Sequence, residues 1–328
     1  MRDAAIFIGL DTSNYTTSFC AVSASGDIVF EKRLLLDVPN GARGLRQSEA
    51  LFQHVQRLPS FFLACSEHLE GKRIAGIACS DAPRRIAGSY MPVFLAGRLG
   101  AEALALGAGV ECLKTSHQSG HLAAGVKTVG WMRDGGVQPF LAIHASGGTT
   151  DLLHVSFDGS DFCVETLGSS LDLHVGQFVD RIGVSLGLPF PAGAKLEVLA
   201  QAHPDDLPLL ELPSVVKQGS PSFSGPLAAL ERARNANVTD AQLAASVFRV
   251  IANTFEKMIR FAVEKTGTRR VLLVGGVASN QRIKNRLQKR FFVQNSGHGA
   301  IDLQLCDPFY ASDNAYGVAL LAAWQNHL

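Results

Sequence analysis

Two stretches of the chain begin in the same way, and this repetition constrains the fold more than any other feature. Each start is an apolar strand, a turn of small polar residues and a second strand. The first start covers residues 4–22 and the second covers residues 140–157. Because 328 residues are enough for two separate cores, the repetition predicts two similar lobes.

Strands and helices alternate after each start, which favours an α/β fold. Six strands are expected at Ala4–Leu10, Thr16–Val22, Ile74–Cys79, Phe140–Ala145, Leu152–Phe157 and Val271–Val274. Helices are expected over Glu49–Cys65, Val93–Leu106, Val175–Leu186, Thr239–Lys265, from near Asn280, and from near Asp313 to Trp324.

Composition excludes several classes of protein. Hydrophobic residues make up 47% of the chain and the net charge is +1, so we expect a compact protein without a global basic field for nucleic acid. None of the six cysteines forms a C-x-x-C pair, and the first apolar run ends at Asp11 after seven residues. We therefore expect a cytoplasmic protein with reduced thiols, no signal peptide and no membrane span.

The segment His117-Gln118-Ser119-Gly120-His121 is a candidate metal site, because a spacing of four places both imidazoles on one face of a helix. Gln118 stands where a zinc protease of the H-E-x-x-H type has its glutamate, which argues against that class. A further ligand is needed, and Asp313 and His144 are the candidates. The alternatives are a helix cap for Asp313 and core packing for His144.

Small polar residues follow three of the expected strands. These turns are Asp11-Thr12-Ser13, Ser146-Gly147-Gly148-Thr149-Thr150-Asp151 and Gly275-Gly276-Val277-Ala278-Ser279-Asn280. Backbone amides in such glycine turns can hold a phosphate, and Asn280 can contact a ribose or a base. The alternatives are ordinary turns, with Asn280 as a helix cap. The P-loop signature is absent from the sequence.

A basic run follows Asn280 directly. Five cations lie within nine residues, with no acid among them: Arg282, Lys284, Arg286, Lys289 and Arg290. Such a run is usually a solvated helix face, and it can also contact a phosphate backbone.

Taken in order, these motifs resemble those of the tRNA threonylcarbamoyladenosine transferase family, over nearly the whole chain. The resemblance rests on the segments Gly9–Ser13, His117–His121, Ala145–Thr149, Gly176–Asp180, Gly187–Gly193, Ser222–Gly225, Gly275–Asn280 and Ser312–Ala315. It implies the actin/hexokinase-like fold of two ribonuclease-H-like lobes. The expected N-terminal lobe is 1–135 with the C-terminal helix 310–328, and the expected C-terminal lobe is 136–309.

The resemblance also implies an activity and a site. The activity is metal-dependent transfer of a threonylcarbamoyl group from its adenylate to the N6 amine of a tRNA adenosine. His117, His121 and Asp313 would hold one divalent metal, iron or zinc, and Asp11 would be the catalytic acid. The residues that would bind the adenylate are Ala145, Ser146, Gly147, Gly148, Thr149, Asp180, Gly193 and Asn280. Implied partners are tRNA, a small P-loop ATPase and a smaller homologous subunit.

The sequence departs from the family pattern around this site. Tyr15 and Thr16 replace two acidic residues of the opening motif, and Thr149 replaces the histidine of S-G-G-H. Arg84 and Arg85 lie in the segment that replaces G-P-G-L, so we expect a more positive pocket. Two alternatives stay open. One is a divergent transferase that uses ATP or an adenylate and binds another anionic substrate through these arginines, and the other is a non-catalytic nucleotide-binding scaffold subunit.

Overall fold

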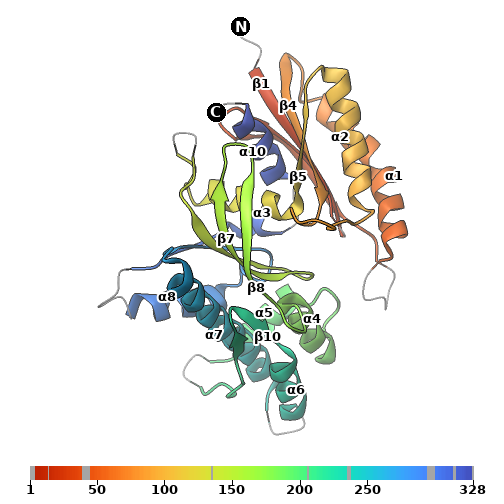
Figure 1. Ribbon diagram of the computed structural model, residues 1–328. Helices are drawn as coiled ribbons and strands as arrows, with labels where there is room; N and C mark the ends of the chain where they lie inside the picture. Colours follow the sequence, from red (N-terminus) through yellow and green to blue (C-terminus); the bar gives the residue numbers. More distant parts are fainter. Residues whose placement is uncertain are drawn as a thin grey trace. The chain divides into compact units, whose positions relative to one another are not determined.

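A computed structural model describes most of the chain. The described residues are 4–13, 15–38, 45–133, 136–204, 207–234, 238–293, 300–312 and 315–326. The chain forms two compact units, each with its own sheet and helices (Figure 1). The first unit consists of residues 1–138, 157–163 and 309–328, and the second consists of 139–156 and 164–308.

The first unit is built on a five-stranded sheet in the order β3-β2-β1-β4-β5. The strands are β1 Ala4–Thr12, β2 Thr16–Ser23, β3 Ile28–Leu35, β4 Lys72–Ala82 and β5 Cys112–Ser116. β1, β2 and β3 pair antiparallel, whereas β1, β4 and β5 are parallel. The central strand β1 is almost continuously apolar because helices cover both of its faces.

Helices on the two faces of this sheet make two separate cores. Ile6, Ile8 and Leu10 pack against α1 Gln47–Ser66 and α2 Phe94–Ala108. On the other face, Phe7 packs with α10 Tyr316–Gln325, which lies against α3 His117–Thr128. The last helix of the chain therefore completes the first unit, next to the helix that carries the histidine pair.

The second unit repeats the strand order of the first. Its sheet runs β12-β11-β6-β7-β8, with an antiparallel β6–β7 pair and parallel β6, β11 and β12. The strands are β6 Phe140–Ala145, β7 Thr150–Phe157, β8 Phe162–Ser169, β11 Arg270–Val274 and β12 Asp302–Leu305. The similarity of the two chain starts thus corresponds to two sheets of one topology, and the predicted α/β class is confirmed.

Helices of the second unit surround a large core. They are α4 Val175–Ser185, α5 Gly193–Gln201, α6 Ser224–Ala233, α7 Asp240–Thr266 and α8 Gln281–Val293. The long helix α7 buries one apolar stripe, including Val247, Ile251 and Phe255, against β6 and α5. The remaining short elements are the hairpin strands β9 Val215–Lys217 and β10 Ser220–Ser222 and the turn α9 Pro308–Ala311. Within the described ranges, no helix is long and apolar enough to cross a membrane.

Candidate metal and nucleotide sites

The histidine pair lies at the start of α3, where the local sequence begins a helix. Ser116 ends β5, and its Oγ accepts a hydrogen bond from the backbone N–H of Ser119 at 3.0 Å. His117 and His121 therefore occupy one face of the first turn. Their Nε2 atoms are 3.1 Å apart, and the two rings are nearly perpendicular, at 82°.

A divalent metal fits this pair. Two nitrogens that each bind one ion at about 2.0–2.1 Å lie roughly 3 Å from one another, and the observed separation is 3.1 Å. Asp313, the predicted third ligand, lies outside the described residues. Among the described residues, no group of three or more His, Cys, Asp or Glu is arranged to hold a metal. His144 is buried on β6 of the second unit.

Asp11 stands behind the histidine pair at the end of β1. Both of its carboxylate oxygens lie 3.1 Å from Nδ1 of His117, and Oδ1 also accepts a hydrogen bond from Oγ of Ser80. The Asp11 side chain is fully buried. A carboxylate on Nδ1 places the proton there and leaves Nε2 of His117 as the metal-binding atom, which is the common arrangement behind metal-bound histidines.

The opening loop after β1 is braced by a histidine that the sequence analysis missed. Nε2 of His54 donates to the backbone carbonyl of Ser13 at 2.9 Å, and Nδ1 accepts from Oγ1 of Thr17 at 2.8 Å. Burial lowers the pKa of His54 to about 4, so this imidazole is neutral. The sequence contained a signal for this role, because the spacing of four places His54 between Ala50 and Leu58 on the buried stripe of α1.

Two glycines bring α10 close to the histidine helix. A Cβ on Gly317 would overlap the backbone carbonyl of Gly120, and a Cβ on Gly120 would lie 3.0 Å from Cγ2 of Val318. Upstream of this crossing, Nη1 of Arg33 donates to the carbonyl of Phe309 at 2.9 Å and to Oγ of Ser312 at 3.2 Å. The glycine within the histidine motif therefore serves helix packing.

The segment that replaces the family's G-P-G-L is tied to the start of α3. The backbone N–H of Gln118 donates to the carbonyl of Pro83 at 3.1 Å. Arg85 forms an ion pair with Asp161 at 3.4 Å, and Asp161 also accepts from Oγ1 of Thr115 at 2.8 Å. A carboxylate thus already offsets the charge of Arg85, one of the two arginines expected to make the pocket positive.

In the second unit, the first glycine turn closes on itself and packs against α4. The backbone N–H of Ser146 donates to the carbonyl of Thr149 at 2.9 Å, and the N–H of Gly176 donates to the carbonyl of Ser146 at 3.2 Å. Gly147 and Gly148 are exposed, with open space where a side chain would stand. Their backbone is therefore accessible to an anion near the start of α4.

The second glycine turn lies beside the first at the same end of the sheet. The N–H of Val277 donates to the carbonyl of Ala145 at 3.1 Å, and a Cβ on Gly275, at φ +94°, would overlap that carbonyl. Only glycine fits there. Asn280 is buried and its Oδ1 accepts from the N–H of Ile283 at 3.1 Å, so it caps α8.

Asp180 on α4 binds the end of the proline-rich loop that precedes α5. Its Oδ1 accepts a hydrogen bond from the backbone N–H of Ala192 at 2.8 Å. Burial raises the pKa of Asp180, and this hydrogen bond partly counters that effect. Gly193 begins α5, and its nearest neighbour at the Cβ position is Cγ1 of Val179 at 3.8 Å. Gly193 is therefore not required by packing.

Asp172 is a second residue that the sequence analysis missed. Its carboxylate accepts hydrogen bonds from Oγ of Ser222 at 2.6 Å, from Oγ of Ser224, and from the N–H of Phe223 at 2.9 Å. Burial opposes ionisation, but these hydrogen bonds outweigh it and lower the pKa of Asp172 to about 2. The Ser222–Gly225 motif is thus anchored by a carboxylate 50 positions upstream of its first serine.

Solved structures of low sequence identity share this fold. The T. kodakarensis HypF structure superposes with a TM-score of 0.62 at 15% identity, over 98% of this chain and 47% of that one. A ROK family glucokinase from Streptomyces griseus gives a TM-score of 0.54 at 11% identity, over 97% and 99%. These neighbours confirm the actin/hexokinase-like architecture.

Curated relatives share the sequence as well. Residues 42–319 match the model of the family tRNA N6-adenosine threonylcarbamoyltransferase. The transferase of that name from Salinibacter ruber is 30% identical, over 75% of both chains. A probable bifunctional tRNA threonylcarbamoyladenosine biosynthesis protein from Methanocaldococcus jannaschii is 25% identical over 96% of this chain. This chain spans 54% of that relative's length.

The family match begins at residue 42, beyond the strands that carry the divergent opening motif. It includes both histidines, both glycine turns and the cap of α8. Together with the fold, this match shows that the chain belongs to the tRNA N6-adenosine threonylcarbamoyltransferase family.

Proposed function

We propose that this protein is a metal-dependent transferase that moves a threonylcarbamoyl group from its adenylate to N6 of a tRNA adenosine. One observation carries the proposal: in a member of this family, the Nε2 atoms of His117 and His121 converge at 3.1 Å, with a buried carboxylate on the far side of His117. Such a constellation suits a bound metal.

His117 and His121 would hold one divalent ion together with Asp313, and zinc and iron both accept imidazole ligands. When bound, the ion would act as a Lewis acid toward the carbamoyl carbonyl or the phosphate. Asp11 does not touch substrate in this proposal, because its carboxylate is buried and engaged by His117 and Ser80. We assign it the role of a positioning residue instead of the catalytic acid expected from the sequence.

The two glycine turns of the second unit would bind the adenylate. The exposed backbone of Gly147 and Gly148, next to the start of α4, suits the phosphate and carbonyl oxygens. Asp180 on α4 and Gly193 at the start of α5 would contact the nucleoside. Asn280 would do so through its amide nitrogen, because its oxygen caps α8.

In the proposed reaction, the adenosine N6 amine attacks the carbamoyl carbon and forms a new C–N bond. The bond from that carbon to the phosphate oxygen breaks, AMP leaves with its electron pair, and the amine loses a proton. The described residues of the opening motif offer no exposed carboxylate to accept this proton, since Tyr15 and Thr16 replace the acidic pair, so the proton would pass to water. We therefore expect a slow transferase that works with a P-loop ATPase and a smaller homologous subunit.

The absence of that acidic pair also favours the second candidate, a nucleotide-binding scaffold subunit. A transfer assay separates the two. Purified protein, threonylcarbamoyl adenylate and unmodified tRNA are combined, and the nucleosides are analysed by mass spectrometry. The transferase yields modified adenosine, and Gly147→Val lowers the yield at least tenfold, whereas Gly107→Ala, on α2 with open space at its Cβ position, does not. A protein that binds the adenylate but forms no product, even with the partner proteins added, is a scaffold.

A further inference from the structure

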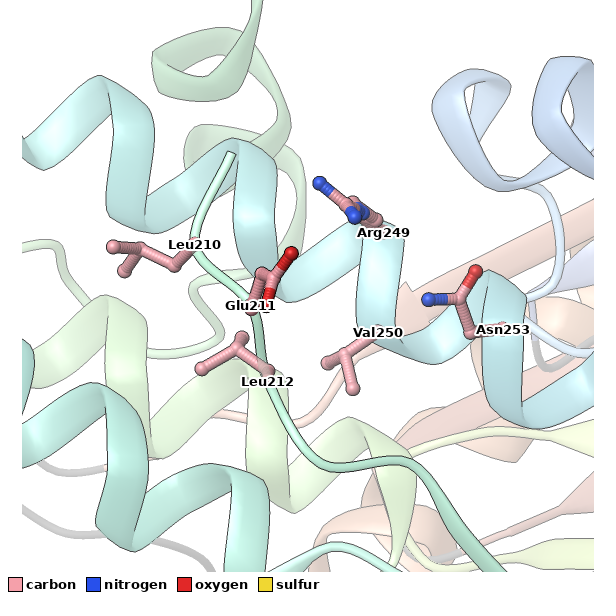
Figure 2. A pocket seen from close by; sticks show the side chains of 6 residues that line it. All are labelled: Leu210, Glu211, Leu212, Arg249, Val250 and Asn253. Carbon is pink, nitrogen blue, oxygen red and sulfur yellow. The ribbon is translucent and has the colours of Figure 1, made fainter. Parts of the chain in front are cut away.

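A basic groove in the second unit has no role in the proposed chemistry. It lies where the segment 207–214 passes beside α7 and α8, and Figure 2 shows one end of it, with Arg249 and Asn253 on α7 near Glu211. The largest of its adjoining cavities has a volume of about 400 Å³ and is lined by Arg249, Arg282, Arg286 and Lys289. Arg286 also lines two neighbouring cavities of about 280 and 230 Å³, so the cavities form one continuous surface, named here the α7–α8 groove.

The charge of this groove is predominantly positive. Its cavities are lined by six lysines and arginines and by only three glutamates. One of these acids, Glu256, forms ion pairs with Arg260 at 2.9 Å and with Arg290 at 2.8 Å. Among the described residues, neither Arg249 nor Arg286 has a carboxylate within ion-pair distance. The protein as a whole carries only +1, so this charge is concentrated locally.

The arginines of the groove are crowded and held in place. Nε of Arg286 donates to Oδ1 of Asn253 at 2.8 Å, and Nη2 of Arg282 donates to the carbonyl of His203 at 3.1 Å. Partial burial and the nearby charges of Arg249 and Arg290 lower the pKa of Arg286. Like charges fixed this close together repel one another, and a bound anion would relieve that repulsion.

We propose that the α7–α8 groove binds the phosphate backbone of an RNA strand. Arg282, Arg286 and Arg290 are spaced four residues apart along α8, which places them in a row with about 6 Å of rise per step. A row of cations suits the repeated phosphates of a polyanion better than a single phosphate. This inference rests on the proposed function, because a tRNA substrate needs sequence-independent contacts that position it.

The groove offers little for base-specific recognition. Its remaining lining includes Leu209, Leu210 and Leu212 of the passing segment, and no Phe, Tyr or Trp is among the lining residues. Stacking platforms for unpaired bases usually need such aromatic rings. We therefore expect binding that depends strongly on salt and weakly on sequence. An acidic polypeptide is the competing kind of ligand, and the test includes it.

The test measures binding of an unmodified tRNA transcript to the full chain, without adenylate, between about 50 and 200 mM KCl. The double variant Arg249→Gln/Arg286→Gln is expected to bind at least tenfold more weakly, with a salt slope smaller by about one to two. Lys217→Gln/Lys265→Gln, which removes two charges from β9 and the end of α7 outside the groove, is the control and should bind like wild type. Thermal unfolding checks that each variant is folded.

A second variant keeps the inference testable if the double arginine variant does not fold. Lys289 is exposed, so Lys289→Glu should leave the fold intact and still weaken binding at least threefold. Unchanged affinity and salt slope in a folded groove variant would overturn the inference, and so would polyglutamate competing as well as RNA. If transfer to tRNA occurs while groove variants bind normally, only this inference fails. If the groove variants lose binding but wild type transfers nothing, only the proposed function fails.

Discussion

At the scale of single residues, the proposed metal site depends on a carboxylate that is fully buried. Asp11 contacts Nδ1 of His117 and is fully buried. Its position at the end of the first strand suggested catalysis, because acids at strand ends often act on ligands. The contacts of Asp11 favour a supporting role instead, because both of its carboxylate oxygens contact Nδ1 of His117 and one also accepts a hydrogen bond from Ser80.

Asp11→Asn should weaken metal binding by about 10- to 100-fold, because an amide holds the imidazole of His117 less firmly than a carboxylate does. Metal content after dialysis against a weak chelator measures this loss. Asp27→Asn, at an exposed acid in the β2–β3 turn, is the matched control. Equal metal content in both variants would show that Asp11 does not support the histidines.

We predict that His54 makes the stability of the protein depend on pH. Its folded pKa of about 4 lies below the unfolded value of 6.5, so the unfolded chain binds more protons between these values. Stability is therefore lost as the pH falls from 6.5 toward 4, by up to about 3 kcal/mol. Urea unfolding at several pH values should show that His54→Gln lacks this slope, whereas His68→Gln, at an exposed site, keeps it. A wild-type slope in His54→Gln would refute the assignment.

At the scale of elements, the distance between α3 and α10 is set by glycine. Gly120 lies between the two histidines in the sequence, and Gly317 is the second residue of α10, four positions after Asp313. A side chain at Gly317 would meet the α3 backbone, which cannot move without displacing the histidine turn. The packing of this helix pair thus sets how closely α10 approaches the turn that carries the two histidines.

Gly317→Ala should destabilise the protein by about 3 kcal/mol or more, because its Cβ would overlap the carbonyl of Gly120. Gly107→Ala is the control: this glycine lies within α2 with open space around it, so alanine should stabilise by up to about 1 kcal/mol. Chemical denaturation gives both values. A mild effect of Gly317→Ala would mean that the two helices can separate without cost.

At the scale of the whole molecule, the sequence predicted what depends on local pattern. The two strand-turn-strand starts became two sheets of one strand order, and the helix ranges agree with the structure to within a few residues. The roles of Asp11 and Arg85 depended instead on partners elsewhere in the fold. Asp161, the partner of Arg85, lies 76 positions away on the β7–β8 turn, and neither spacing nor hydropathy pairs such residues.

The same distinction explains the two missed anchors. His54 and Asp172 are isolated polar residues that belong to no motif. His54 nevertheless binds the opening loop after β1, and Asp172 binds the Ser222–Gly225 turn. Their effect comes from hydrogen bonds across 37 to 52 positions of the chain. Residues that support a motif are harder to predict than the motif itself, because the sequence does not show which distant segments meet.

We propose that His117 and His121 bind a metal that the transfer reaction requires, and one titration tests this proposal directly. Metal-free protein receives increasing zinc or ferrous iron, while bound metal and modified tRNA are measured in the same samples. We predict that activity rises in proportion to bound metal and saturates at about one ion per chain, and that His117→Gln/His121→Gln gains neither. Full activity in the metal-free protein, or equal metal binding by the double variant, would show that the histidine pair does not hold a required metal.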